Sequence, residues 1–173
     1  MILVGMYDSP FVRRVAIALR LYGMEFEHRP WSVFRDAEQV ARYSPLIRVP
    51  ILVLDESEVL VDSSAILDGL DDLVGPGRAL MAAEGPERRR QLRVCALACG
   101  LGDKVVSLIY EKAVHERGTP AWVERCQAQI SGTLDRLEAE RRAIASRWWF
   151  GDAIGHADVA VVCVLTLAVE ALG

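Results

Sequence analysis

The chain has 173 residues, of which 52% are hydrophobic and 25% are charged, and its formal net charge at pH 7 is −4. This composition excludes a disordered protein, because disordered chains carry too few apolar residues to form a core. The acidic balance does not favour binding to nucleic acid, which needs a basic surface. The longest apolar stretch, residues 159–169, is shorter than the ~20 residues that cross a bilayer, so we expect a buried helix there and no membrane span.

The cysteines and histidines do not form a metal-binding pattern. The four cysteines, at positions 95, 99, 126 and 163, contain no pair with a two-residue spacing, and the three histidines are scattered, so the sequence predicts no metal site. Cys95 and Cys99 are four residues apart on one helical face, where free cysteines are usually small core residues. The N-terminal stretch carries no secretion signal, and we therefore expect a protein of the reducing cytoplasm.

The first part of the chain alternates short apolar runs with stretches of helical spacing. Residues 2–7 predict a first strand. Ser9 and Pro10 provide an N-cap and a proline for the first helical position, and the helix that they begin is expected to stop at Gly23. A second strand at residues 26–30 completes a strand–helix–strand unit, which predicts two parallel strands.

The next residues continue this alternation. A short helix is expected near residues 36–42, and a strand at residues 49–54 turns through residues 55–57 into a fourth strand at residues 58–61. A helix then runs from residue 62 to residue 75. This order predicts a thioredoxin-like α/β domain with a mixed sheet, because the last two strands form a hairpin.

The second part of the chain shows only helical spacing. Long helices are expected over residues 92–109, over residues 123–144 and from about residue 155 to the end, which indicates an all-α bundle. Turn residues rich in Gly and Pro separate the two parts. We therefore predict a thioredoxin-like domain over residues 1–76, a linker over 77–85 and a helical domain over 86–173.

Three motifs carry a resemblance to a known family. They are residues 9–15 (SPFVRRV), residues 48–50 (RVP) and the pair at 62–63 (DS). In this order and spacing they resemble the glutathione transferase family, and most of all its bacterial members with serine at the active site. Residues 151–152 and 155–159 are similar to the signature of that family's helical domain. The resemblance spans the whole chain and implies the glutathione transferase fold, with glutathione as co-substrate.

The resemblance implies that Ser9 acts on the glutathione thiol, whose ordinary pKa of ~8.5 leaves little thiolate at pH 7. As an N-cap, Ser9 accepts a backbone hydrogen bond through its oxygen, and its hydroxyl proton stays available to donate to sulfur. The helix N-terminus also favours an anion. Tyr7 is the rival for this role, although we expect it to lie in the first strand as a packing residue.

The other motifs are expected to hold the rest of the tripeptide. The resemblance implies a cis bond before Pro50, with the backbone of Val49 paired to the cysteinyl segment like an added strand. It also implies that Arg48 reaches the glycyl carboxylate and that Asp62 meets the γ-glutamyl ammonium. Ser63 offers its backbone N–H and its hydroxyl to the γ-glutamyl carboxylate. Together with Ser9, the predicted glutathione-binding residues are Arg48, Val49, Pro50, Asp62 and Ser63.

These residues predict a glutathione transferase that activates the thiolate for attack on a small hydrophobic electrophile or a peroxide, in a detoxification role. Serine cannot attack a disulfide, so thiol–disulfide exchange is disfavoured. Two alternatives stay open: a non-catalytic protein of this fold, similar to the stringent starvation protein A group, and a glutathione-dependent isomerase of the maleylacetoacetate isomerase type. Of Arg13 and Arg14, at least one is expected to pair with an acidic group or a helix end, and neither is predicted to be catalytic.

The C-terminal helix has two features of note. It is expected to begin at Gly155, with Asp158 reaching back to the Gly155 N–H as half of a capping box. The chain ends at Gly173, whereas the resemblance implies one or two further helices, so either the sequence is naturally short or its tail is missing. Apolar surface near the central helix would then be exposed, and we expect a homodimer.

Overall fold

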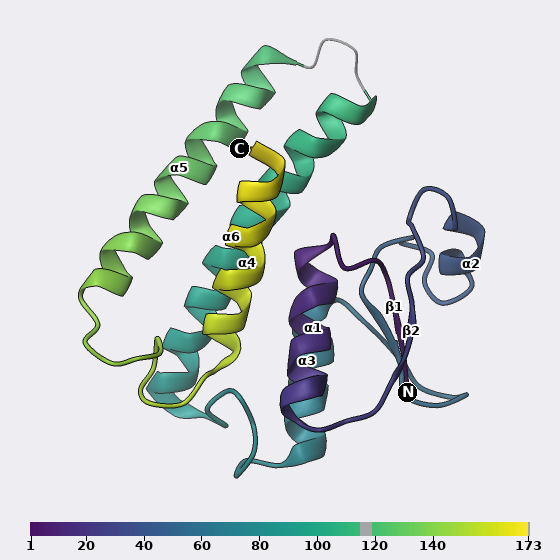
Figure 1. Ribbon diagram of the computed structural model, residues 1–173, viewed down its shortest axis with the longest axis horizontal. Coiled ribbons are helices and arrows are strands. Elements are labelled where there is room, and N and C mark those ends of the chain that lie inside the picture. Colours follow the sequence, from purple (N-terminus) through teal and green to yellow (C-terminus); the bar gives the residue numbers. More distant parts are fainter. Residues whose placement is uncertain (115–118, 173) are drawn as a thin grey trace. The chain divides into compact units, whose positions relative to one another are not determined.

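The computed structural model describes residues 1–114 and 119–172 (Figure 1). The chain forms two compact units, Met1–Ala83 and Glu84–Gly173. The first contains the sheet with the three helices that cover it, and the second is all helical. Within the described residues, no helix is both long enough and apolar enough to cross a membrane.

The sheet of the first unit has four short strands: β1 (Ile2–Val4), β2 (Glu27–Arg29), β3 (Ile51–Val53) and β4 (Val59–Val61). Their order is β2-β1-β3-β4. β1 is parallel to β2 and antiparallel to β3, and β3 is antiparallel to β4. The strand–helix–strand unit, the closing hairpin and the mixed sheet are therefore confirmed.

The first strand is shorter than the sequence predicted, and the placement of Tyr7 in it is wrong. β1 ends at Val4, and Gly5 follows with φ +128°, a conformation that turns the chain out of the strand. Tyr7 lies in a turn beyond it and is 44% exposed. A glycine that continues an apolar run gives no sign from sequence alone that its φ is positive.

Helices cover both faces of the sheet. They are α1 (Pro10–Leu21), α2 (Ala37–Ala41) and α3 (Ser63–Val74). α1 lies in front of α3 in Figure 1, and the two helices share a buried cluster with Leu3 and Leu52 of the sheet. Val40 of α2 packs on the opposite face against Val4 and Ile51. α1 and α3 therefore form one layer on the same face of the sheet, and their N-termini lie in that layer.

A buried tyrosine ties the end of the first unit to its helices. The Tyr22 hydroxyl donates to the Asp71 carboxylate in a short hydrogen bond and accepts from the Leu80 N–H at 3.1 Å. The Arg78 guanidinium donates to the Tyr22 carbonyl. Burial, together with the bond to Asp71, raises the pKa of Tyr22 above its usual range. Residues 78–80 are thus held against Tyr22, which follows α1, and Asp71 of α3.

The described residues of the second unit form a bundle of three helices, as predicted. α4 (Gly85–Val114) contacts both α5 (Pro120–Arg142) and α6 (His156–Leu172) (Figure 1). The core contains apolar residues from all three helices, among them Leu101, Val105, Ile130, Val164 and Leu167. Ile144, expected in the second helix, lies just beyond the end of α5.

The start of α6 is fixed by Asp158. Its Oδ2 accepts from the Gly155 N–H at 2.9 Å, which confirms the predicted half of a capping box. Its Oδ1 accepts from the Trp149 N–H at 2.8 Å, so the same carboxylate also holds the loop before the helix. This second bond is a tertiary contact that the spacing of the motif did not predict.

An ion-pair cluster joins α4 to α5 and predicts an acid-sensitive contribution to stability. Glu140 accepts from Arg93 at 2.8 and 2.6 Å and also from Arg136. The Arg93 bonds, reinforced by Arg136, lower the pKa of Glu140 to about 2 from 4.5. Because the folded pKa lies below the unfolded one, the cluster stabilises fully above about pH 4.5 and loses this effect as the pH falls toward about 2.

Replacing Glu140 with glutamine is expected to lower the free energy of unfolding by about 1 kcal/mol at pH 7, and the difference from the unchanged chain should shrink below about pH 4.5. Urea unfolding at a series of pH values measures this. Glu138→Gln is the matched control, because Glu138 pairs with Arg142 on the exposed surface of the same helix. A Glu140→Gln deficit that stays constant down to pH 3 would contradict the assignment.

Candidate active site

The candidate site is built around the beginning of α1. The Ser9 N–H donates to the Met6 carbonyl at 3.3 Å, which closes a turn with Tyr7 and Asp8 at its tip. Ser9 is the N-cap, and its Oγ accepts from the Val12 N–H at 3.4 Å. The predicted cap is therefore confirmed. Since the oxygen acts as acceptor in this bond, the hydroxyl proton can be donated to another group.

Gly5 brings the first helix close to the loop before β3. A Cβ at Gly5 would lie 2.6 Å from Cγ2 of Val12 and 2.8 Å from Cβ of Val49. No real Cβ tolerates these distances, so only glycine allows β1, α1 and the Val49 loop to approach this closely. The two predicted elements, Ser9 on its helix and Val49 on its loop, are thereby packed against one strand end.

The loop that carries Val49 has an unusual backbone. The Val49–Pro50 peptide bond is cis, as the resemblance implied. Val49 is half-buried, and neither its N–H nor its C=O has a hydrogen-bond partner among the described residues. Ile47 adopts φ +49°, a strained conformation for a β-branched residue, and Arg48 beside it is exposed. The loop thus presents peptide groups that can pair with an extended ligand.

The beginning of α3 supplies the second pair of predicted residues. Asp62 is the N-cap with φ +71°, and its Oδ1 accepts from the Ser64 N–H at 2.8 Å. Ser63 is the first residue of the helix, so its N–H has no partner within the helix, and the residue is 3% exposed. A strained N-cap and an inward serine at a helix N-terminus form a setting that favours an anion.

Arg14 joins the two helix beginnings, and sequence reasoning did not assign it to the site. This residue of α1 is only 2% exposed, and its Nη1 donates to Oγ of Ser63 at 3.3 Å and to Oγ of Ser64 at 3.5 Å. Arg14 therefore places a positive charge next to the first two residues of α3. A usable signal existed, because Arg14 lies four residues before the apolar Ala18 and therefore on the same helical face, and the structure buries Ala18.

Arg13 has a different environment. Its Nη2 donates to the Asp8 carbonyl at 3.1 Å, across the turn that leads into α1. The expectation that at least one of the two arginines meets a helix end is confirmed by Arg14. Helical geometry explains the contrast, since neighbouring residues of a helix point about a quarter-turn or more apart.

Tyr7, the rival for the role of Ser9, lies against a different part of the unit. Its ring stacks on the His28 imidazole with centroids 4.0 Å apart and an angle of 12° between the planes. His28 belongs to β2, and its Nε2 lies 2.7 Å from the Gly5 carbonyl. The ring is therefore held at the edge strand of the sheet, with one face covered by the imidazole.

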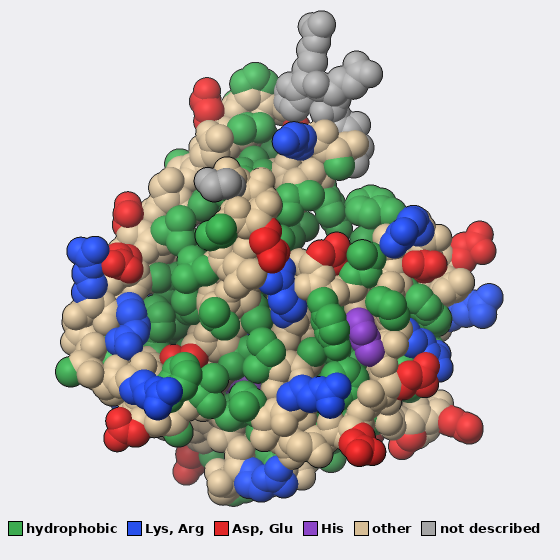
Figure 2. Space-filling model, viewed as in Figure 1, with side chains coloured by type: hydrophobic (Ala, Val, Ile, Leu, Met, Phe, Trp, Pro, Cys, Tyr) green, Lys and Arg blue, Asp and Glu red, His purple; other side chains and the backbone are tan. Residues whose placement is uncertain are grey.

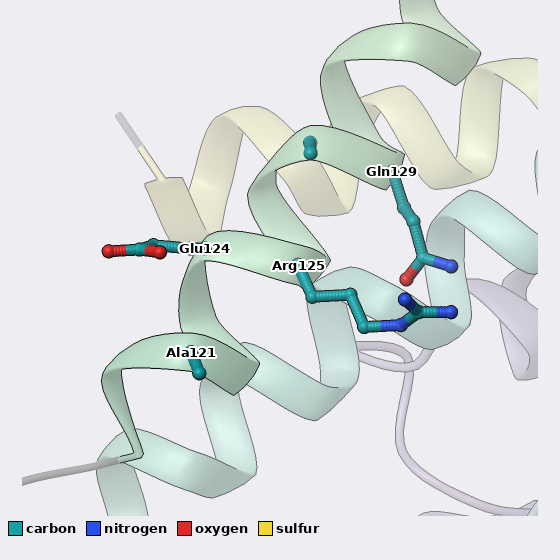
Figure 3. A pocket seen from close by; sticks show the side chains of 5 residues that line it. Ala121, Glu124, Arg125 and Gln129 are labelled. Carbon is teal, nitrogen blue, oxygen red and sulfur yellow. The ribbon is translucent and has the colours of Figure 1, made fainter.

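The second unit has a surface hollow of its own on α5. Its lining residues are Ala121, Glu124, Arg125, Ala128 and Gln129. In Figure 3, Arg125 and Gln129 extend to the same side of α5 and Glu124 points away from them. None of the predicted site residues lines this hollow. Among the residues that the structure describes, no group of three His, Cys, Asp or Glu side chains is arranged to hold a metal.

Comparisons with known proteins agree with this geometry. Residues 3–78 match the family model of the glutathione S-transferase N-terminal domain, and residues 120–172 match that of the C-terminal domain. Maleylacetoacetate isomerase of Pseudomonas aeruginosa is 30% identical over 166 residues, which cover 90% of this chain and 76% of the relative.

Two solved structures are similar as well. A glutathione S-transferase of Methylobacterium radiotolerans, in complex with glutathione sulfonate, is 29% identical with a TM-score of 0.86 and covers 97% of this chain and 78% of its own. A glutathione transferase family member of Pseudomonas fluorescens with bound glutathione is 30% identical with a TM-score of 0.82, at 98% and 83% coverage. The chain belongs to the glutathione S-transferase family, and the predicted fold is confirmed.

Proposed function

We propose that this protein is a glutathione transferase, which binds glutathione in the first unit and activates its thiol for attack on a small electrophile. The observation that carries the proposal is the position of Ser9, whose hydroxyl caps α1 beside the Val49 loop. The family relationship adds support, since similar proteins have been solved with glutathione or glutathione sulfonate bound. In glutathione sulfonate a negatively charged sulfonate group takes the place of the thiol, so this ligand carries an anion at the position of the sulfur.

Ser9 is proposed to stabilise the thiolate. A hydrogen bond to an ion contributes roughly 1.5–3 kcal/mol, which corresponds to about one to two pKa units for the bound thiol. The N-terminal end of the α1 helix dipole adds a favourable field for the same anion. The proton leaves the thiol before attack, and the sulfur then forms a bond to the electrophilic atom.

The other predicted residues are proposed to hold the peptide. The backbone N–H and C=O of Val49 pair with the cysteinyl segment, and Arg48 meets the glycyl carboxylate. Asp62 meets the γ-glutamyl ammonium, while the N–H and hydroxyl of Ser63 meet the γ-glutamyl carboxylate. The positive charge of Arg14, which donates to Ser63, supports this orientation of the γ-glutamyl group, because it favours the carboxylate at the N-terminus of α3.

A glutathione-dependent isomerase is the second candidate, favoured by the 30% identity to maleylacetoacetate isomerase of Pseudomonas aeruginosa. In an isomerase the thiolate adds to the substrate and leaves again, so glutathione is regenerated. Measuring whether thiol is consumed during turnover separates this activity from conjugation. A non-catalytic protein of the same fold would show neither reaction.

Titration calorimetry with millimolar glutathione tests the proposal directly. We expect binding to the unchanged chain and an affinity about tenfold weaker for Asp62→Asn, which removes the carboxylate charge but keeps an N-cap acceptor. Asp72→Asn is the matched control, because Asp72 is exposed near the other end of α3. No heat from a folded sample of the unchanged chain would eliminate the enzymatic proposal and leave only the fold.

We also propose a homodimer that works in the cytoplasm. Hydrophobic side chains reach the surface among the charged ones in Figure 2. Those exposed on α6 follow one helix face at spacings of three or four residues: Val162, Leu165, Val169 and Leu172. Such a stripe favours association with another surface. The cytoplasm is the compartment that the sequence predicts.

A further inference from the structure

Side-chain hydrogen bonds join α1 to α3 at two points. Near the beginning of both helices the Arg14 guanidinium donates to Oγ of Ser63, and near their ends the Tyr22 hydroxyl donates to the Asp71 carboxylate. Each bond connects residues that are 49 positions apart in the chain. An equal separation at two points means that the helices run parallel in a single register, with the two bonds about 12 Å apart along the axis.

The Tyr22–Asp71 pair is buried and directional. Tyr22 is 5% exposed and Asp71 is 9% exposed. The Leu80 N–H donates to both, at 3.1 Å to the Tyr22 hydroxyl and at 3.3 Å to Oδ1 of Asp71. The pair has no role in the proposed contacts to glutathione. Because a hydrogen bond depends on direction and apolar packing does not, the pair opposes sliding of α1 along α3.

The register determines how far apart the two helix beginnings lie. α1 begins at Pro10, four residues before Arg14, whereas α3 begins at Ser63, the residue that Arg14 meets. α1 therefore extends beyond α3 by about 6 Å along the axis. This offset separates Ser9, which is proposed to act on the thiol, from the N-terminus of α3, which is proposed to hold the γ-glutamyl carboxylate. Glutathione carries both groups on one molecule, so it meets both helices only at a suitable offset.

We infer that Tyr22 is a positioning residue for glutathione: through Asp71 it fixes the register in which Ser9 and the N-terminus of α3 act on the same molecule. This inference rests on the proposed function. Tyr22 follows the far end of α1, about 20 Å along the helix from Ser9, so it acts without touching glutathione. A bond so distant can still matter, since a displacement of about 1 Å at a reacting group can cost about 100-fold in rate.

Tyr22→Phe tests the inference, because it keeps the ring in the core and removes only the hydroxyl. We expect the affinity of glutathione to fall about tenfold in titration calorimetry, since a helix pair that drifts in register no longer offers both contacts at once. Cysteinylglycine carries only the thiol part, and γ-glutamylglycine carries only the γ-glutamyl part, so each meets one helix beginning. Their affinities, measured by ligand-observed NMR, should stay within about twofold of those of the unchanged chain.

Asp71 offers a conservative and a disruptive variant at the other side of the bond. Asp71→Asn keeps an amide oxygen that accepts from the Tyr22 hydroxyl, so the affinity of glutathione should stay within about twofold. Asp71→Leu removes the acceptor and should reproduce the tenfold loss of Tyr22→Phe, again about tenfold for glutathione alone. Glu140→Gln, which weakens the contact between α4 and α5, is the control for a general loss of stability.

The two fragments separate positioning from a merely structural role, because a loosened fold would weaken all three ligands. Unchanged glutathione affinity in Tyr22→Phe, or equal losses for glutathione and both fragments, would refute the positioning role and leave the glutathione transferase proposal intact. Failure of the unchanged chain to bind glutathione would instead refute the proposed function, and the positioning role with it.

Discussion

Ser9→Ala is expected to slow conjugation by about 10- to 100-fold, because the bound thiolate loses a charge-assisted hydrogen bond of roughly 1.5–3 kcal/mol. The pKa of bound glutathione should rise by about one to two units, while its affinity stays nearly unchanged. The ultraviolet absorbance of the thiolate, followed against pH in the glutathione complex, measures the shift. Steady-state rates with a saturating electrophile measure the loss.

The cap and the thiolate bond can be separated by a second variant. Ser9→Ala also removes the N-cap and is expected to lower the free energy of unfolding by about 1 kcal/mol. Ser9→Asp keeps a cap acceptor for the Val12 N–H but has no hydroxyl proton to donate. It should therefore match the unchanged chain in stability and still conjugate slowly. Normal rates in both variants would remove Ser9 from the mechanism and direct attention to the Tyr7 hydroxyl.

Arg14→Met is expected to weaken glutathione binding by roughly 10- to 100-fold, or about 1.4–2.8 kcal/mol. The substitution keeps a long apolar stem in the buried position but removes the donor to Ser63 and Ser64. The anion site at the N-terminus of α3 then loses its supporting charge. Arg13→Met, one residue earlier on the more exposed side of α1, is the matched control and should bind normally.

The binding of cysteinylglycine shows which part of glutathione Arg14 acts on. It lacks the γ-glutamyl group, so its affinity should be the same in Arg14→Met and in the unchanged chain if Arg14 acts on that group. Arg14→Lys keeps a charge but not the planar fork of donors, and an intermediate affinity is expected. Equal losses for glutathione and cysteinylglycine would mean that Arg14 only maintains the fold, which circular dichroism and unfolding measurements would then confirm.

Local signals in the sequence were enough for most elements. Ser9 and Pro10 marked the start of α1 because an N-cap and a following proline act within one turn. The spacing of Gly155 and Asp158 predicted their hydrogen bond for the same reason. The cis bond before Pro50 followed from the family resemblance and not from local chemistry, since an isolated X–Pro bond is usually trans.

The sequence by itself therefore determined the order of strands and helices, the mixed sheet and the positions of Ser9, Asp62 and Ser63 at helix beginnings. Val49, which was expected in the third strand, lies instead in the loop before β3. Only the tertiary structure decided that Arg14 reaches Ser63, 49 residues away in the chain, and that Tyr7 leaves the first strand to stack on His28. The physical reason is distance along the chain. Caps and periodicity depend on near neighbours, whereas a buried cation and a ring stack depend on which elements the core packs together.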